Sequence, residues 1–203
     1  MESTLLKRVF SGLSVILHPV FLFMYIFFFL LYKTDVFWGY FQAFNIKLIT
    51  GYLFVNTILI PILITYLVNK DFQLNNKALR TVPLFVFIVV YVITFFLLTR
   101  ILAPAILLRY VAAVILLGIL LLVLNSFMKV SLHSAGWGLT LAFFLYLFFK
   151  NNDQSVYFYA IIGCLMLAGL AGTARLYLKA HNPTEIFTGY LTGILSMIVI
   201  LFV

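Results

Sequence analysis

Charged and polar residues are scarce in this sequence. Only 9% of the 203 residues are charged, whereas 66% are hydrophobic, and no long polar segment is present. This composition excludes a water-soluble globular domain. We predict an all-α fold, a polytopic transmembrane helical bundle of about 6–7 membrane-spanning helices. Residues 1–203 are expected to form a single integral-membrane domain.

Cysteine and acidic residues are also nearly absent. The single cysteine, Cys164, lies in an apolar run and excludes an internal disulfide. Only 5 residues are Asp or Glu, against 13 Lys or Arg, which gives a formal net charge of +8. The basic residues stand between apolar runs and form no continuous basic segment. We therefore expect membrane lipids, and no nucleic acid, as partners.

Long apolar runs fill the rest of the sequence, each close to the roughly 20 residues that cross a bilayer as a helix. They cover residues 9–32, 48–69, 81–99, 101–128, 130–149, 155–174 and 186–203. The first is too long for a signal peptide and has no small-residue cleavage site, so we expect a retained helix that kinks at His18-Pro19. The third and fourth meet at Arg100, where one re-entrant hairpin is the alternative. Gly189 and Gly193 are spaced for close helix packing.

Most polar residues fall at the ends of these runs. If the chain crosses the membrane seven times, alternate connections lie on the same side. The side of the N-terminus receives Lys77, Arg80, Lys129, Ser131, His133, Arg175, Lys179, His181 and Glu185, whereas the other side has no histidine. Ionisable groups at membrane depth are costly and commonly mark a functional site. We expect these side chains to converge at one end of the bundle.

The converging residue types suit phosphoryl transfer from an anionic ester. Two or three cations can hold phosphate oxygens and stabilise transition-state charge. One histidine can be the nucleophile, oriented by a carboxylate, and a second can protonate the leaving oxygen. Two histidines and a glutamate are also a possible zinc-ligand set. The surrounding positive charge disfavours a cation, so we predict no metal and no cofactor.

Structural roles are open for some of the same residues. Asn182-Pro-Thr-Glu185 has the pattern of a helix start, with Asn as the cap, Pro at the first helical position and Glu at the third. Arg175 and Lys179 are one helical turn apart, a spacing that interfacial anchors also have. His18, next to Pro19, suits a buried imidazole at a helix kink.

Two motifs resemble signatures of the type 2 phosphatidic acid phosphatase family, membrane lipid phosphatases related to haloperoxidases. Arg175, five residues, His181, three residues and Glu185 is similar to the third signature, Ser-Arg-x5-His-x3-Asp. Val130-Ser-Leu-His133 is similar to the second, Pro-Ser-Gly-His, and a transmembrane hairpin separates the two signatures in both cases. Lys77-Ala-Leu-Arg80-Thr-Val-Pro83 keeps the residue types of the first, Lys-x6-Arg-Pro, but not its spacing. The phosphatase-like core covers about residues 77–193 and follows two transmembrane helices.

The resemblance implies metal-independent hydrolysis of a lipid phosphate or pyrophosphate through a phosphohistidine. By position, His181 is expected to be the nucleophile, His133 the general acid and Glu185 the orienting carboxylate. The residues expected to hold phosphate are Arg175, Ser131, Arg80, Lys77 and Lys129.

Departures from the signatures leave a second function open. Glu185 stands in place of Asp, Leu132 in place of Gly, Val130 in place of Pro and Ala174 in place of Ser. These changes also fit a catalytically inactive member that binds an anionic lipid or serves as a structural subunit among membrane-protein partners. In either case we expect an integral protein of the bacterial inner membrane. The positive-inside rule favours a cytoplasmic site, whereas the resemblance favours a site that faces away from the cytoplasm.

Overall fold

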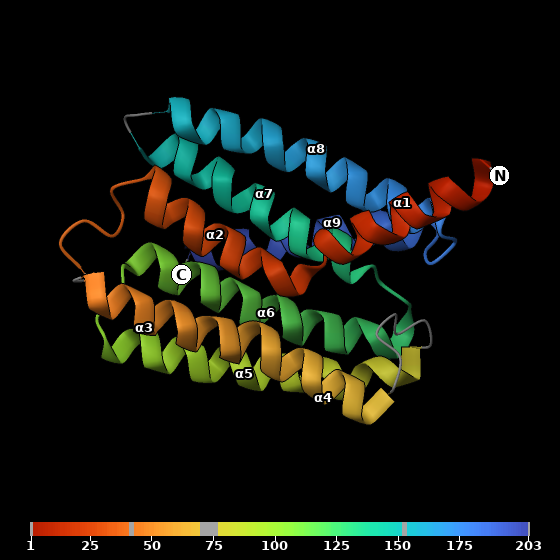
Figure 1. The fold of residues 1–203 in the computed structure, drawn as a ribbon, viewed down its shortest axis with the longest axis horizontal. Coiled ribbons are helices and arrows are strands. Elements are labelled where there is room, and N and C mark those ends of the chain that lie inside the picture. Colours follow the sequence, from red (N-terminus) through yellow and green to blue (C-terminus); the bar gives the residue numbers. More distant parts are fainter. Residues whose placement is uncertain (1, 41–42, 70–76, 152–153, 203) are drawn as a thin grey trace.

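The protein is a bundle of long helices that run back and forth between two ends (Figure 1). The computed structural model describes residues 2–40, 43–69, 77–151 and 154–202, and none of these lies in a β-strand. The helices are α1 (Glu2–Ile16), α2 (Pro19–Lys33), α3 (Ala43–Phe54), α4 (Ile60–Asn69), α5 (Thr81–Arg100), α6 (Ala105–Phe127), α7 (Leu132–Lys150), α8 (Ser155–Tyr177) and α9 (Pro183–Phe202). A π-helical turn, Val55–Leu59, joins α3 to α4, and a 3-10 turn, Lys77–Arg80, precedes α5. The predicted all-α fold is confirmed.

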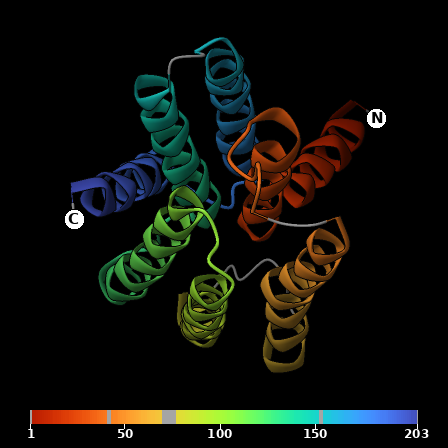
Figure 2. The same cartoon turned by 90° about the vertical axis from the view of Figure 1, so that its left-hand side faces the viewer.

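Helix α7 lies inside the bundle, flanked by α6, α8 and α9 (Figure 2). Its buried residues include aromatic and small side chains along most of its length, among them Trp137, Gly138 and Phe143. Large apolar side chains are exposed along the other helices. A helix that is apolar around its whole circumference is typical of a buried or membrane-spanning position.

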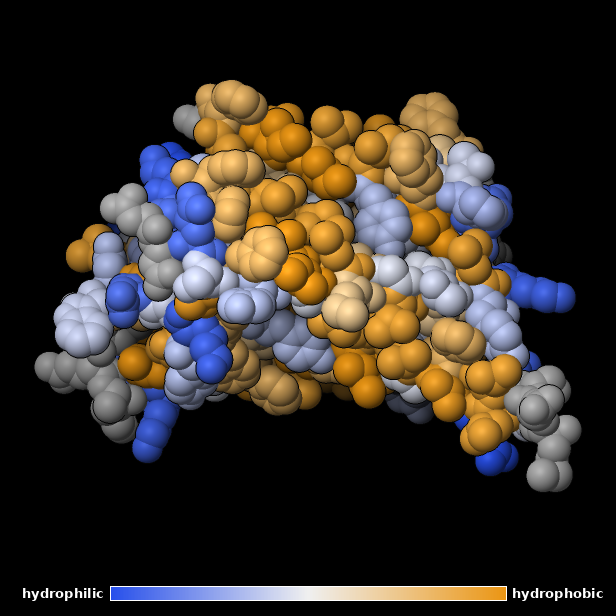
Figure 3. All heavy atoms as spheres, turned by 90° about the horizontal axis from the view of Figure 1, so that it is seen from above, coloured by the Kyte–Doolittle hydropathy of each residue, from blue (hydrophilic) through white to orange (hydrophobic). Residues whose placement is uncertain are grey.

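The outer surface is suited to lipid. Six helical segments are long and apolar enough to cross a membrane by their length and composition. They are Asn45–Val68, Thr81–Arg100, Ala105–Phe127, Leu132–Lys150, Ser155–Tyr177 and Pro183–Phe202. Figure 3 shows a hydrophobic surface over the middle of the molecule, with hydrophilic residues gathered toward its two ends. The chain is an integral membrane protein, as predicted.

The third and fourth predicted spans are two separate helices. α5 ends at Arg100, and α6 begins at Ala105, directly after Pro104, so four residues separate the two helices. Leu102, between them, takes a left-handed backbone conformation with φ 53°. This tight turn returns the chain so that α5 and α6 pack against one another.

The predicted kink at His18-Pro19 is a full break between two helices, α1 and α2, whose axes differ by 58°. Pro19 has no backbone N–H, so the last turn of α1 cannot continue its hydrogen-bond ladder. Side chains bind carbonyls of that turn instead: Trp137 Nε1 donates to Leu17 O (3.1 Å) and Tyr25 Oη to Ile16 O (3.0 Å). His18 Nδ1 accepts from Val20 N (3.2 Å) and so caps α2.

Helices α7 and α9 approach each other closely through glycines. A Cβ on Gly193 would lie 2.7 Å from the backbone N of Leu139, and one on Gly189 would lie 2.6 Å from the carbonyl of Ser131. A Cβ on Gly138 would lie 3.0 Å from Tyr190 Cα. Because these neighbours are backbone atoms, they cannot rotate away. The absence of side chains at both glycines of α9 therefore sets the α7–α9 distance.

We expect Gly193→Ala to destabilise the protein, because the added methyl group would push α9 away from α7. Overpacking of this kind costs about 1–3 kcal/mol. Gly163→Ala on α8 is the matched control, since nothing lies within 4 Å of a Cβ there. Thermal unfolding of purified protein in detergent measures both. An unchanged melting temperature for Gly193→Ala would show that the close approach is not required.

Candidate active site

The predicted site residues with described side chains lie at one end of the bundle, at the right of Figure 1. This end contains the start of α5, the α6–α7 and α8–α9 connections, and the nearby break between α1 and α2. The side chain of Lys77, another predicted phosphate ligand, lies outside the described part of the structure. Lys129 and Arg175 also line a basic cavity at this end.

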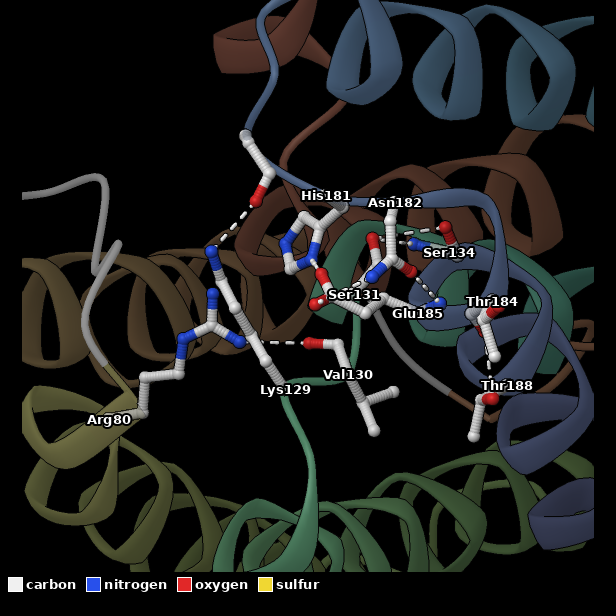
Figure 4. Close-up of polar contacts among 11 residues, drawn as sticks. Arg80, Lys129, Val130, Ser131, Ser134, His181, Asn182, Thr184, Glu185 and Thr188 are labelled. Atoms are coloured by element: carbon white, nitrogen blue, oxygen red, sulfur yellow. Dashed lines mark hydrogen bonds and ion pairs between the residues drawn. The ribbon is translucent and has the colours of Figure 1, made fainter.

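His181 and Glu185 form the shortest polar contact of the site, shown in Figure 4. His181 Nδ1 lies 2.6 Å from Glu185 Oε2. Asn182 Oδ1 accepts from Glu185 N (2.8 Å), and Asn182 Nδ2 donates to the second carboxylate oxygen (3.3 Å). Glu185 therefore belongs to the cap of α9 and also contacts the imidazole. Glu185 can therefore take part in the helix cap and orient His181 at the same time.

The environment of His181 favours a neutral imidazole. Burial is the main cause of a His181 pKa lowered from 6.5 to about 4, and the nearby cations Arg175, Arg80 and Lys129 lower it further. The hydrogen bond with Glu185 acts in the opposite direction. At neutral pH the contact is therefore an imidazole N–H that donates to a carboxylate. This tautomer carries its proton on Nδ1 and leaves a lone pair on Nε2.

Two cations are fixed to backbone carbonyls around His181 (Figure 4). Arg80 donates from its Nη1 to Val130 O (2.8 Å), and Lys129 donates from Nζ to Ala180 O (2.8 Å). Burial lowers the pKa of Arg80 to about 10, with a smaller contribution from the charge of Arg175. Burial also lowers the pKa of Lys129. Arg80 remains cationic at neutral pH, so the carbonyls orient positive charge without neutralising it.

Arg175, in the last turn of α8, is buried but incompletely bonded. Its Nη1 donates to Ser14 Oγ on α1 (3.0 Å). Its Nε is buried and has no hydrogen-bond partner among the described residues. An unsatisfied buried donor on a charged group is costly, and such groups in native structures call for an explanation such as an absent ligand.

Ser131 connects the starts of α7 and α9. Its backbone N donates to Glu185 O (3.1 Å), and its side chain caps α7 by accepting from Ser134 N (3.3 Å). Ser134 Oγ also lies 3.0 Å from Ser131 Oγ. The hydroxyl predicted to hold phosphate thus has a capping role in this structure, and its backbone holds the two site-bearing helix ends together.

His133 contacts the end of α1. Its Nε2 lies 2.9 Å from Ser14 O and 3.4 Å from Ser14 Oγ. A carbonyl oxygen can only accept, so Nε2 carries a proton and donates it to Ser14 O. The His18 ring meets the His133 ring edge-on, with centroids 4.9 Å apart. The predicted general acid is therefore a hydrogen-bond donor, and its present acceptor belongs to this chain.

Ser14 and His18 are site residues that the sequence reasoning missed. Ser14 lies in an apolar run without a recognisable motif, and the sequence predicts His18 as a buried imidazole at a helix kink but not as a neighbour of His133. The available signal was Pro19, because a proline break frees carbonyls that other polar side chains then bind. Nothing in the spacing of α1 indicated that those side chains would be His133 and Arg175.

An apolar cavity of about 420 Å³ opens among these groups. Arg80, His133, Arg175 and His181 line it at the helix ends, and Tyr91, Tyr110 and Leu139 line it further along α5, α6 and α7. Its volume lies within the range of roughly 300–1,000 Å³ that is usual for small-molecule sites. The combination of cations at one end and apolar walls beyond them suits an amphiphilic anion.

Comparison with known families gives one match. Residues 123–203 match the model of the PAP2 superfamily. This segment contains the two motifs at His133 and His181, and the match supports the predicted family. No curated protein and no solved structure matches the chain. Among the residues that the structure describes, no three His, Cys, Asp or Glu side chains are grouped to hold a metal ion; the absence of a cofactor stays a prediction.

Opposite changes in the pKa of His181 are expected from two substitutions. Arg80→Gln removes a cation that disfavours the imidazolium, so the pKa should rise. Glu185→Gln removes the carboxylate that favours the imidazolium, so the pKa should fall further. NMR titration of ¹³C-labelled histidines in detergent micelles, assigned with His181→Ala, measures both. Arg109→Gln, whose guanidinium contacts Tyr146 Oη at the other end of the bundle, is the control. Shifts in the same direction for the two site variants would contradict this electrostatic picture.

Proposed function

Because residues 123–203 match the model of the PAP2 superfamily, we propose that this integral membrane protein is a phosphatase of lipid phosphates or pyrophosphates that acts through a phosphohistidine. The family match and the apolar helices fit a membrane phosphatase in general. The observation that carries the finer proposal is the contact between His181 and Glu185, 2.6 Å long, in the neighbourhood of three cations. The proposed location is the bacterial inner membrane.

In the first step, Nε2 of neutral His181 attacks the phosphorus atom, and the bond between phosphorus and the leaving oxygen breaks. Glu185 stabilises the positive charge that develops on the imidazole. Arg80, Arg175 and Lys129 stabilise the negative charge on the equatorial oxygens of the phosphoryl group. The low pKa of His181 supports this role, because a nucleophilic imidazole must be unprotonated.

His133 supplies the leaving-group proton. In its imidazolium form it donates the Nε2 proton to the leaving oxygen and becomes neutral. It then accepts a proton from a water molecule that attacks the phosphorus of phospho-His181. The P–N bond breaks, and inorganic phosphate and neutral His181 are released. For this step the leaving oxygen must take the place that Ser14 O has beside His133 in the structure.

A lipid is the proposed substrate because the apolar cavity adjoins the cationic groups. The phosphate would lie among Arg80, Arg175 and His181, and apolar chain would enter the cavity beyond them. Phosphatidate, phosphatidylglycerophosphate and polyprenyl pyrophosphate all combine these chemical features. The proposal requires no metal, since the cations of the site supply the positive charge.

The purified protein is expected to release phosphate from at least one of these three lipids in the presence of a chelator. His181→Ala should lower the rate to the detection limit, because no other described side chain has the same position beside Glu185. Arg109→Gln, at the opposite end of the bundle, should retain wild-type turnover. Phosphate release that survives in His181→Ala, or that is lost to the chelator, would refute the mechanism.

The acid limb of the pH profile provides an independent measurement. His181 must be neutral to attack, and its pKa is lowered to about 4. Protonation therefore removes the nucleophile only near that pH, so kcat/KM should be maintained well below pH 6.5 and fall as the pH approaches 4. A limb near the ordinary histidine value, 6.5, would show that the cations do not depress the pKa of His181.

A catalytically inactive lipid-binding or structural protein is the second candidate. The observation that favours it is the hydrogen bond from His133 to Ser14 O, 2.9 Å long, which gives this histidine a purely structural task. It predicts no phosphate release from any lipid. It also predicts that His133→Ala/His181→Ala restores a deletion phenotype as fully as the wild type does.

A further inference from the structure

A second cavity, which we call the basic bay, lies between α1 and the α8–α9 connection. Its volume is about 560 Å³. Its cationic lining residues are Lys7, Arg8, Lys129, Arg175 and Lys179, and Thr4 and Ser11 add hydroxyl groups. The cations come from α1, the α6–α7 connection, and the end of α8 with the turn after it. Positively charged side chains from three parts of the chain that are distant in sequence thus line one cavity.

No acidic residue lines the basic bay in the described part of the chain. Glu185 is the described carboxylate nearest in sequence to Lys179, and it is already bonded to His181 and Asn182. Like charges that surround one cavity repel each other, and the charge of Arg175, which is buried, is screened less by solvent than the charges of the exposed cations. A bound anion would remove this repulsion.

Arg175 supplies a second observation. It is only 6% exposed, lines the basic bay, and has a buried Nε without a described partner. The guanidinium group therefore keeps unused donor capacity for a planar or tetrahedral oxyanion. Arg175 and Ser11 also line the apolar cavity, so the two cavities adjoin at this arginine.

The turn after α8 holds a lysine where glycine is favoured. Lys179 has φ 52°, at the position after the helix cap. Lys179 N donates to Leu176 O (2.9 Å) and Ala180 N to Arg175 O (3.0 Å), the paired bonds of a Schellman motif. A lysine in this left-handed conformation is less favourable than a glycine, because its Cβ approaches the backbone closely. Glycine would suit this backbone conformation better, yet the chain has a lysine here, and its charge lines the basic bay.

We propose that the basic bay is a second anion-binding site for a phosphate group, which adjoins the phosphoryl-transfer position at His181, shares Arg175 and Lys129 with it, and adds Lys7, Arg8 and Lys179. The ligand is either inorganic phosphate or the phosphate of an anionic lipid headgroup, since both present the same oxygens to Arg175 and the lysines. Lys7 and Arg8 bind it from α1, and Lys129 and Lys179 bind it from the opposite wall. An anion in the bay thereby attaches α1 to the α8–α9 connection.

Ligand-induced stabilisation of the full-length protein tests the site. The melting temperature is measured in phosphatidylcholine nanodiscs with increasing inorganic phosphate, and in nanodiscs that contain phosphatidylcholine with phosphatidylglycerol but no added phosphate. One or both ligands should raise it. Lys7→Gln/Arg8→Gln should weaken the apparent affinity by about tenfold or more, since two charge-assisted contacts are lost.

Two further variants make the measurement specific. Lys179→Gly keeps the turn and relieves its φ while it removes a charge, so it should weaken ligand stabilisation without lowering the melting temperature of the unliganded protein. Lys33→Gln/Lys150→Gln, at the other end of the bundle, is the charge-matched control. Stabilisation by phosphate alone identifies a site for the free anion, and stabilisation by phosphatidylglycerol alone identifies a headgroup site.

Equal ligand response in the wild type, Lys7→Gln/Arg8→Gln and Lys179→Gly would overturn the proposal, as would no response to either ligand. The readout does not depend on turnover, so it separates this site from the phosphatase proposal. In His181→Ala, the dependence on Lys7, Arg8 and Lys179 should persist. If that dependence is present while no lipid is hydrolysed, the anion site stands and the phosphatase proposal fails.

Discussion

The close packing of α7 on α9 is the constraint on which the site depends. Gly189 and Gly193 allow the backbones of the two helices to approach, and the approach brings Ser131 N within 3.1 Å of Glu185 O. That bond joins the start of α7, which carries His133, to the start of α9, which follows His181. If α7 and α9 were farther apart, the same side chains would be present, but His133 and His181 would no longer lie at neighbouring helix starts. The two glycines therefore help to set the geometry of the candidate site, although they have no reactive side chains.

The second constraint is the proline break between α1 and α2. Without an N–H at Pro19, α1 ends with carbonyls that α7 and α2 side chains must satisfy. His133 binds Ser14 O and Trp137 binds Leu17 O, one helical turn apart on α7. The same turn of α1 presents Ser14 Oγ to Arg175. Helix α1 lies outside the family match, yet it contacts His133 and Arg175, two predicted site residues inside the match.

Much of this arrangement follows from the sequence alone. Apolar runs of bilayer length predict how the chain alternates between the two ends of the bundle, and this alternation brings the α6–α7 and α8–α9 connections to one end. The pattern Asn182-Pro-Thr-Glu185 correctly indicates the start of α9. The contact between Glu185 and His181 follows less directly. The glutamate is one methylene longer than the aspartate of the family signature, and it contacts both Asn182 and the imidazole.

The roles of Ser14 and His18 do not follow from sequence, because they depend on the rotation of α1 about a break and not on spacing. α1 meets α2 at an angle of 58°, and in this arrangement the end of α1 contacts His133. The direction of such a bend is set by tertiary packing, which for α1 is mainly contact with α8. Local patterns contain no information about it.

Ser14 connects the two proposed activities of this chain. Its carbonyl accepts from His133 Nε2 and its hydroxyl from Arg175 Nη1, so one residue presents two oxygens to a proposed acid and a proposed phosphate ligand. A phosphate ester would offer the same pair, a leaving oxygen and an equatorial oxygen. In the proposed mechanism a leaving oxygen would have to replace Ser14 O beside His133, whereas the inactive alternative keeps this contact. Because Lys7 and Arg8 lie on α1 and line the basic bay, an anion held there favours the bound position of α1.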